Sequence, residues 1–175
     1  YMLRPAIAAE RQNTEEAFVQ ELRLVSNGDQ NLDWTIGAFY MDQEASAAQQ
    51  TRARGFQEWA TAVEPEGFGY GYGLYYDPST NVTFDWSHER FYTDFAVFGE
   101  ITWKLNDDVD LTLGARYFDN EDRVTSQTSF PIWGAFNPVV KDTQTDSDTL
   151  VKMNLAWRYS DSVMLYGTIS EGYRR

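Results

Sequence analysis

The sequence contains no cysteine, a single histidine and far fewer cations than anions. Without cysteine, neither a disulfide framework nor a thiolate metal site can form, and the lone His88 leaves a histidine-based metal site without ligands. The formal net charge of −13 argues against a nucleic-acid partner, because such proteins need a basic surface that neutralises phosphates. We therefore expect no metal, no cofactor and no nucleic acid.

Long hydrophobic runs are also missing. No stretch of about 18 apolar residues is present, which excludes a transmembrane helix. A transmembrane β-strand needs only about 9–11 residues with alternate positions apolar, so a membrane location stays open. Aromatic residues, by contrast, are abundant at 16% of the chain, with six tryptophans. Aromatic residues favour β-strands and are scarce in disordered chains, so the composition indicates a folded β protein.

Six segments alternate with the two-residue period of a β-strand. In each of the first five, apolar side chains fill one face and polar or charged side chains fill the other. The sixth alternates less cleanly, and its outward face is either Leu165 and Ile169 or Met164 and Tyr166. We expect strands at residues 18–26, 32–42, 91–105, 109–119, 149–159 and 163–173.

The connections between these strands alternate between short and long. Residues 27–31, 106–108 and 160–162 are rich in Gly, Asn, Asp and Ser, as expected for hairpin turns. Residues 43–90 and 120–148 are too long for ordinary loops of a compact soluble domain. Transmembrane barrels combine short periplasmic turns with long extracellular loops, so this pattern favours an antiparallel transmembrane β-barrel segment.

The sequence also repeats itself. LDWTIGAFYMD, from Leu32 to Asp42, aligns without gaps to VDLTLGARYFD, from Val109 to Asp119. ITWKLNDDV, at residues 101–109, matches LAWRYSDSV, at residues 155–163. Repeated strand-turn-strand units are expected when successive hairpins cross the same slab of membrane.

Aromatic residues lie near the ends of these strands, where a barrel carries its membrane-interface girdles. Alternating strands with polar turns also occur in soluble β-sandwiches and jelly rolls, in which the charged face is simply solvated. The alternation of short and long connections, and the tryptophans beside the short turns, favour the barrel. The expected girdle residues are Trp34, Tyr40, Trp103, Tyr117, Trp157 and Tyr159.

The hairpins resemble those of TonB-dependent outer-membrane receptors. The matching stretches are residues 17–42, 91–123 and 149–175, and they are specific as a set. The motifs that carry the resemblance are Gln20-Glu21-Leu22-Arg23-Leu24 followed by Trp34, Gly37 and Tyr40; Phe98-Gly99-Glu100 followed by Gly114, Arg116 and Tyr117; and Tyr166 followed by Glu171-Gly172-Tyr173-Arg174.

This resemblance implies a receptor in the Gram-negative outer membrane that takes up a scarce solute such as a ferric siderophore, cobalamin or an oligosaccharide. Its partners would be outer-membrane lipid, the small-molecule ligand and TonB, which contacts a missing N-terminal region. A complete barrel of this kind has about 22 strands around a plug, so we expect residues 1–175 to be an internal barrel fragment without its plug domain. A smaller porin or adhesin barrel and a soluble carbohydrate-binding β-sandwich are the alternatives.

We expect no enzymatic activity. Ser87-His88-Glu89 has the residue types of a hydrolase triad, but consecutive side chains on a strand point apart and cannot form the relay. The long stretch 43–90 contains many aromatic residues, which either contact a ligand or pack into a cluster of their own. Tyrosine and tryptophan suit sugar rings and aromatic chelators. The expected ligand-binding residues are therefore Trp59, Tyr70, Tyr72 and Tyr75, ahead of Phe84 and Trp86.

Overall fold

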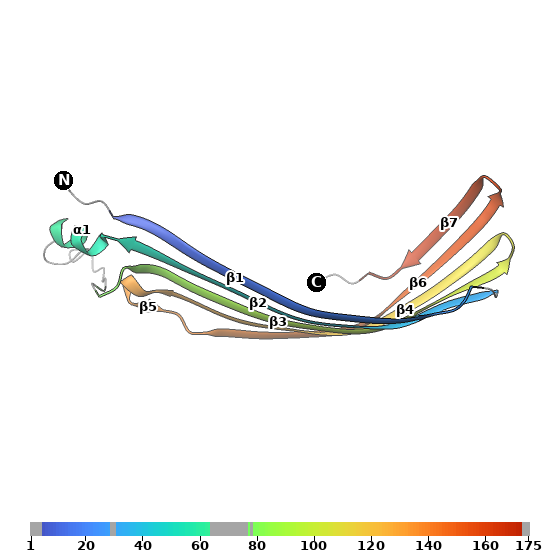
Figure 1. The fold of residues 1–175 in the computed structure, drawn as a ribbon, viewed down its shortest axis with the longest axis horizontal. Coiled ribbons are helices and arrows are strands. Elements are labelled where there is room, and N and C mark those ends of the chain that lie inside the picture. The colour runs from blue at the N-terminus through green and yellow to red at the C-terminus, as the bar shows by residue number, and fades with distance from the viewer. Residues whose placement is uncertain (1–4, 29–30, 64–76, 78, 173–175) are drawn as a thin grey trace. The chain divides into compact units, whose positions relative to one another are not determined.

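A computed structural model describes residues 5–28, 31–63, 77 and 79–172. Helix α1 (Phe56–Val63) follows the second strand, and the 3-10 helix η2 (Pro131–Trp133) follows the fourth. Nearly everything else in the described residues is strand (Figure 1). The strands are β1 (Ala6–Val25), β2 (Leu32–Arg54), β3 (Val82–Asn106), β4 (Val109–Phe130), β5 (Ala135–Phe136), β6 (Val140–Ser160) and β7 (Val163–Ser170).

These strands form one sheet in the order β1-β2-β3-β4-β6-β7, and the two-residue β5 pairs with β4. Strands adjacent in sequence are therefore adjacent in the sheet, as in an up-and-down barrel wall. The prediction of an all-β, antiparallel barrel segment with six main strands is confirmed. No helix in the described part of the chain is long and apolar enough to cross a membrane.

The three short turns are where the sequence predicts them, but the strands extend into both long connections. β2 continues to Arg54 and β3 begins at Val82, so much of the predicted loop 43–90 belongs to the sheet. In the same way, β4 runs to Phe130 and β6 begins at Val140. The predicted bounds were wrong in β2, β4 and β6 because both faces of their extensions are rich in polar and small residues. The extension of β3 does alternate, with Val82, Phe84 and Trp86 on one face. Alternation reveals a strand only where its two faces meet different surroundings, whereas the backbone ladder needs no such pattern.

Large apolar side chains are exposed on one face of the sheet. Ile36, Val97, Ile101, Leu113 and Leu155 belong to this apolar face, and each is more than 40% exposed. The opposite, polar face carries most of the charged side chains and their ion pairs. Such a large exposed apolar surface is what a lipid-facing wall presents.

The facing of the sixth strand is resolved by its pairing with β6. In the antiparallel register, Ile169 lies opposite Met153, and Leu165 lies opposite Trp157. Residues directly opposite each other share a face, so Leu165 and Ile169 belong to the apolar face. Met164, opposite Arg158, belongs to the polar face. β7 ends at Ser170, earlier than predicted, and Tyr173 lies outside the described residues.

Candidate functional site

The chain divides into two compact units, and each has a stretch of the polar face. One comprises Tyr1–Glu16, Gln43–Phe91 and Arg123–Thr143; we call it the helix unit because it contains α1. The other comprises Ala17–Asp42, Tyr92–Asp122 and Gln144–Arg175; we call it the turn unit because it contains the three short turns. The polar face of each unit is described by itself.

In the turn unit, some long side chains extend over a small residue of the neighbouring strand and contact the strand beyond it. The Arg116 guanidinium of β4 lies 5.6 Å from the ring centroid of Phe39 on β2. On the strand between them, Ala96 is fully buried. Arg116 also lies 3.9 Å from a carboxylate oxygen of Asp94 on β3. The small residue on β3 therefore allows one arginine to join three strands.

A hollow of about 340 Å³ opens on this polar face. Glu100 on β3 and Lys152 on β6 form an ion pair at its wall. Arg23 on β1 contributes a guanidinium 5.5 Å from the Phe98 ring centroid. Both cations and carboxylates line the hollow, so this surface can bind polar or charged groups of either sign. Other lining residues include Glu21, Arg116 and Glu171.

In the helix unit, the polar face holds the only histidine. His88 stacks on Trp86, with ring centroids 5.8 Å apart and planes inclined by 14°. The Arg11 guanidinium lies 5.8 Å from the Trp86 ring centroid, a cation–π arrangement. A shallow hollow of about 510 Å³ lies nearby, lined by residues that include Asn13, Glu15, Ala45, Ala47, His88 and Arg90. An aromatic pair beside guanidinium groups suits planar or anionic ligand groups.

Ser87, His88 and Glu89 lie on β3, where consecutive side chains point to opposite faces. His88 is half-buried on the polar face, whereas its two chain neighbours are exposed on the opposite side of β3. The stacking of His88 on Trp86 was not anticipated, although the alternation of β3 places residues two apart on one face.

Trp59, the first of the expected ligand-binding residues, lies on α1 and is partly buried. Its ring centroid is 5.8 Å from that of Phe56, which in turn packs edge-on to Trp133 at 5.9 Å. These three rings form a small cluster beside the buried residues Ala60 and Ile132. Packing among themselves, the alternative weighed for these aromatics, is therefore observed here. Tyr70, Tyr72 and Tyr75 lie outside the described residues, and ligand binding by all four stays a prediction.

Phe84 and Trp86 lie on β3, as their alternating sequence suggests. Phe84 packs edge-on to Phe130, with ring centroids 5.7 Å apart. Trp133, which anchors the α1 cluster, was missed because it follows β4 in a stretch without strand alternation.

The six expected girdle residues are all exposed, from 38% for Tyr40 to 65% for Tyr159. Three of them take part in ring contacts: Tyr40 with Phe18 at 6.4 Å, and Trp157 with Tyr159 at 5.3 Å between centroids. Exposed aromatic rings with polar tips are typical of membrane interfaces. Their role as a girdle remains a prediction.

In the loop before β3, local hydrogen bonds join Ser79 to Asp77. The Ser79 backbone N–H and hydroxyl both donate to Asp77 Oδ1, at 2.8 and 2.6 Å. These bonds, the hydroxyl bond first, lower the pKa of Asp77 below its ordinary value. The Asp77 backbone N–H donates to the Ile132 carbonyl at 2.7 Å, which ties the loop to η2.

Comparison with known proteins agrees with this geometry. The family described as "TonB dependent receptor-like, beta-barrel" matches residues 8–175. No curated protein sequence matches the chain. Among solved structures, the ferric yersiniabactin uptake receptor FyuA from Yersinia pestis is similar in fold, with a TM-score of 0.69 at 15% sequence identity. The match covers 93% of this chain but only 21% of that receptor. The chain belongs to the TonB-dependent receptor-like β-barrel family.

Proposed function

We propose that this chain is part of the wall of an outer-membrane receptor that imports a scarce solute with energy supplied through TonB. The observation that carries the proposal is the division of consecutive hairpins into an exposed apolar face and a polar face of ion pairs. That division suits a wall with lipid on one side and a hydrated lumen on the other. Family membership and the fold similarity to a siderophore receptor support it.

Within this function, a ferric siderophore is the solute class we favour over cobalamin and oligosaccharides. Arg11, Trp86, His88 and Arg90 on the polar face of the helix unit combine cations with aromatic rings. Chelators that carry carboxylates or aromatic groups match such side chains. We infer a transport role rather than an enzymatic one, because the matching family is that of TonB-dependent receptors and the structural neighbour is an uptake receptor.

The test is uptake by cells that express the full-length receptor. We expect accumulation of radioactive iron supplied as a siderophore complex, and its loss when TonB is deleted. Uptake that persists without TonB would instead indicate a passive porin, the second candidate. A receptor that reaches the outer membrane but imports no ferric chelate, while importing cobalamin or a glycan, would retain the transport function and overturn the solute class.

A further inference from the structure

The internal repeat places an aspartate and a glycine four positions apart on two strands. β2 has Asp33 and Gly37, and β4 has Asp110 and Gly114. All four belong to the polar face of the turn unit. Each aspartate and each glycine is contacted by the strand that follows in the sheet, and the contacting residues occupy equivalent positions in both copies.

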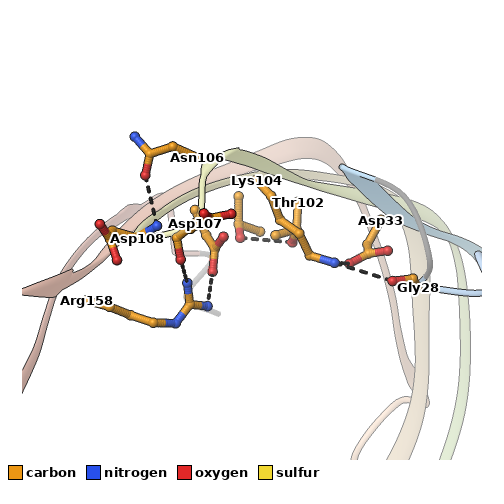
Figure 2. Close-up of polar contacts among 10 residues, drawn as sticks. Gly28, Asp33, Thr102, Lys104, Asn106, Asp107, Asp108 and Arg158 are labelled. Carbon is orange, nitrogen blue, oxygen red and sulfur yellow. Dashed lines mark hydrogen bonds and ion pairs between the residues drawn. The ribbon is translucent and has the colours of Figure 1, made fainter. Parts of the chain in front are cut away.

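The first shared contact is a clamp at the turn. Lys104 Nζ lies 2.9 Å from Asp33 Oδ2, and it also donates to the Gly28 carbonyl of the preceding turn at 3.4 Å. Figure 2 shows the equivalent arrangement in the second copy, where Arg158 reaches back to the turn before β4. Arg158 Nη2 lies 2.6 Å from Asp110 Oδ2, and Nη1 donates to the Asp107 carbonyl at 3.1 Å.

The backbone of each clamp residue repeats the pattern. The Lys104 N–H donates to the Asn31 carbonyl at 2.8 Å, and the Arg158 N–H donates to the Asp108 carbonyl at 2.7 Å. In both copies, therefore, the backbone and the side chain of one cation hold the preceding hairpin at its turn.

The second shared contact, which we call the glycine seat, is made by a side chain of the following strand that lies over the glycine. The Phe98 ring occupies the space that a Cβ on Gly37 would need, and the Lys152 side chain passes 2.8 Å from where a Cβ on Gly114 would lie. Phe98 precedes Lys104 by the same number of residues as Lys152 precedes Arg158. In both copies, therefore, the residue that covers the glycine and the cation that binds the aspartate are separated by the same number of residues on the following strand.

This spacing matters because alternation fixes strand register only in part. A slip of one residue turns every apolar side chain to the polar face, but a slip of two residues keeps all the faces correct. The native register of β2 and β3 is marked by the Asn31–Lys104 bond and by Gly99, where an added Cβ would lie 3.7 Å from Ile36 Cγ2. Hydrophobic burial alone does not distinguish this register from its two-residue neighbours.

The clamp opposes a two-residue slip in one direction, and the seat opposes a two-residue slip in the other. A slip in one direction brings Asp33 opposite Glu100, where two carboxylates repel, and removes Lys104 from its partner. A slip in the other direction brings Phe98 opposite Phe39 and leaves Gly37 without its covering ring. Asp33 Oδ1 and Asp110 Oδ1 are buried and accept no hydrogen bond within the described residues. Each carboxylate therefore depends on its cation for compensation.

We propose that the repeated aspartate clamp and glycine seat form a two-point register lock between consecutive hairpins. β7 carries Met164 and Thr168 at the positions that correspond to Asp110 and Gly114, so the lock is absent from the third copy of the repeat. The lock accounts for why aspartate and glycine recur together at this spacing in β2 and β4.

Disulfide trapping during refolding of the full-length receptor, in a cysteine-free background, tests the lock. Ile36→Cys with Gly99→Cys reports the native register. Ile36→Cys with Val97→Cys reports the slip that places Asp33 opposite Glu100, and Ile36→Cys with Ile101→Cys reports the slip in the other direction. We expect Asp33→Asn to raise the Val97 cross-link about fivefold, and Phe98→Ala to raise the Ile101 cross-link by a similar factor.

Two control variants separate the lock from general destabilisation. Lys104→Arg copies the cation of the second clamp and should leave all cross-links unchanged. Glu21→Gln removes an ion pair between two residues of β1, which cannot report on register, and should also change nothing.

Exclusive native cross-linking in both Asp33→Asn and Phe98→Ala would overturn the proposal. If Asp33→Asn fails to fold, the doubly neutral Asp33→Asn/Lys104→Gln receptor decides. A slipped cross-link in that receptor supports the lock, whereas recovery with the native cross-link alone overturns it.

Discussion

The Lys152 side chain of β6 lies across Gly114 of β4 and forms an ion pair with Glu100 of β3. A lysine can span the strand between only because that strand has no side chain at the crossing point. Gly37 has the same role under Phe98, but its surroundings are stiffer, since a Cβ there would also lie 2.7 Å from the Leu22 backbone carbonyl.

This difference predicts unequal effects of alanine at the two glycines. Gly37→Ala must displace an aromatic ring and backbone, so we expect a loss of about 1–3 kcal/mol in unfolding free energy. Gly114→Ala meets only a flexible lysine and should cost less than about 1 kcal/mol. Urea titration of the full-length receptor, read from the gel mobility of the folded form, measures both. Gly99→Ala is the control, because a Cβ there would come no closer than 3.7 Å to its neighbours. Equal costs at all three positions would contradict the explanation.

The assignment of faces predicts opposite outcomes for adjacent residues of β2. Ile36 is 49% exposed on the apolar face, so Ile36→Arg should cost about 2–4 kcal/mol if the residue lies near the membrane midplane. Thr35→Arg places the same charge on the polar face, near Glu100, and should be tolerated. The folded fraction in lipid vesicles measures both variants. A tolerated arginine at position 36 would show that this face does not meet lipid.

The facing of β7 gives a second pair of matched substitutions. Met164 lies opposite Arg158 on the polar face, and Leu165 lies opposite Trp157 on the apolar face. Met164→Asp should preserve or improve folding, because it supplies the carboxylate that the other two repeats have. Leu165→Asp should reduce the amount of folded receptor in the membrane. The reverse order in a heat-modifiability assay would mean that β7 faces the other way.

These faces show how far the sequence alone predicts the fold. Alternation identified the six strands and their turns because Ile36 and Thr35 meet different surroundings. It failed beyond Asp42 and Asn120, where both faces are rich in polar and small residues, and at β7, whose facing needed its register with β6. The internal repeat identified Gly37 and Gly114 as equivalent positions. Their structural role depends on contacts with Phe98 and Lys152, which are distant in the sequence. Such contacts depend on strand register, and alternation along the sequence cannot distinguish registers that differ by two residues.

We predict that the short turns lie on the periplasmic side of the outer membrane and that the long connections lie outside the cell. Asp161 lies in the turn between β6 and β7, and Glu58 is exposed on α1 after β2. In intact cells we expect a membrane-impermeant thiol reagent to label Glu58→Cys but not Asp161→Cys. Permeabilised cells, in which both should react, provide the control. Labelling of Asp161→Cys alone in intact cells would invert the proposed topology.

Trp59 on α1, together with Tyr70, Tyr72 and Tyr75, is the expected place of ligand capture. Replacing Trp59, Tyr70 and Tyr72 together by alanine should weaken ligand binding about tenfold or more, because each stacked ring contributes about 0.5–1.5 kcal/mol. Binding of a ferric siderophore to cells, with receptor abundance measured in parallel, tests this. Trp59 also packs on Phe56, so Phe56→Ala is the matched control, since it disturbs the cluster but leaves the three proposed contacts in place. An equal loss of binding in Phe56→Ala would assign the effect to packing. Unchanged binding by the triple variant would remove these residues from the ligand site.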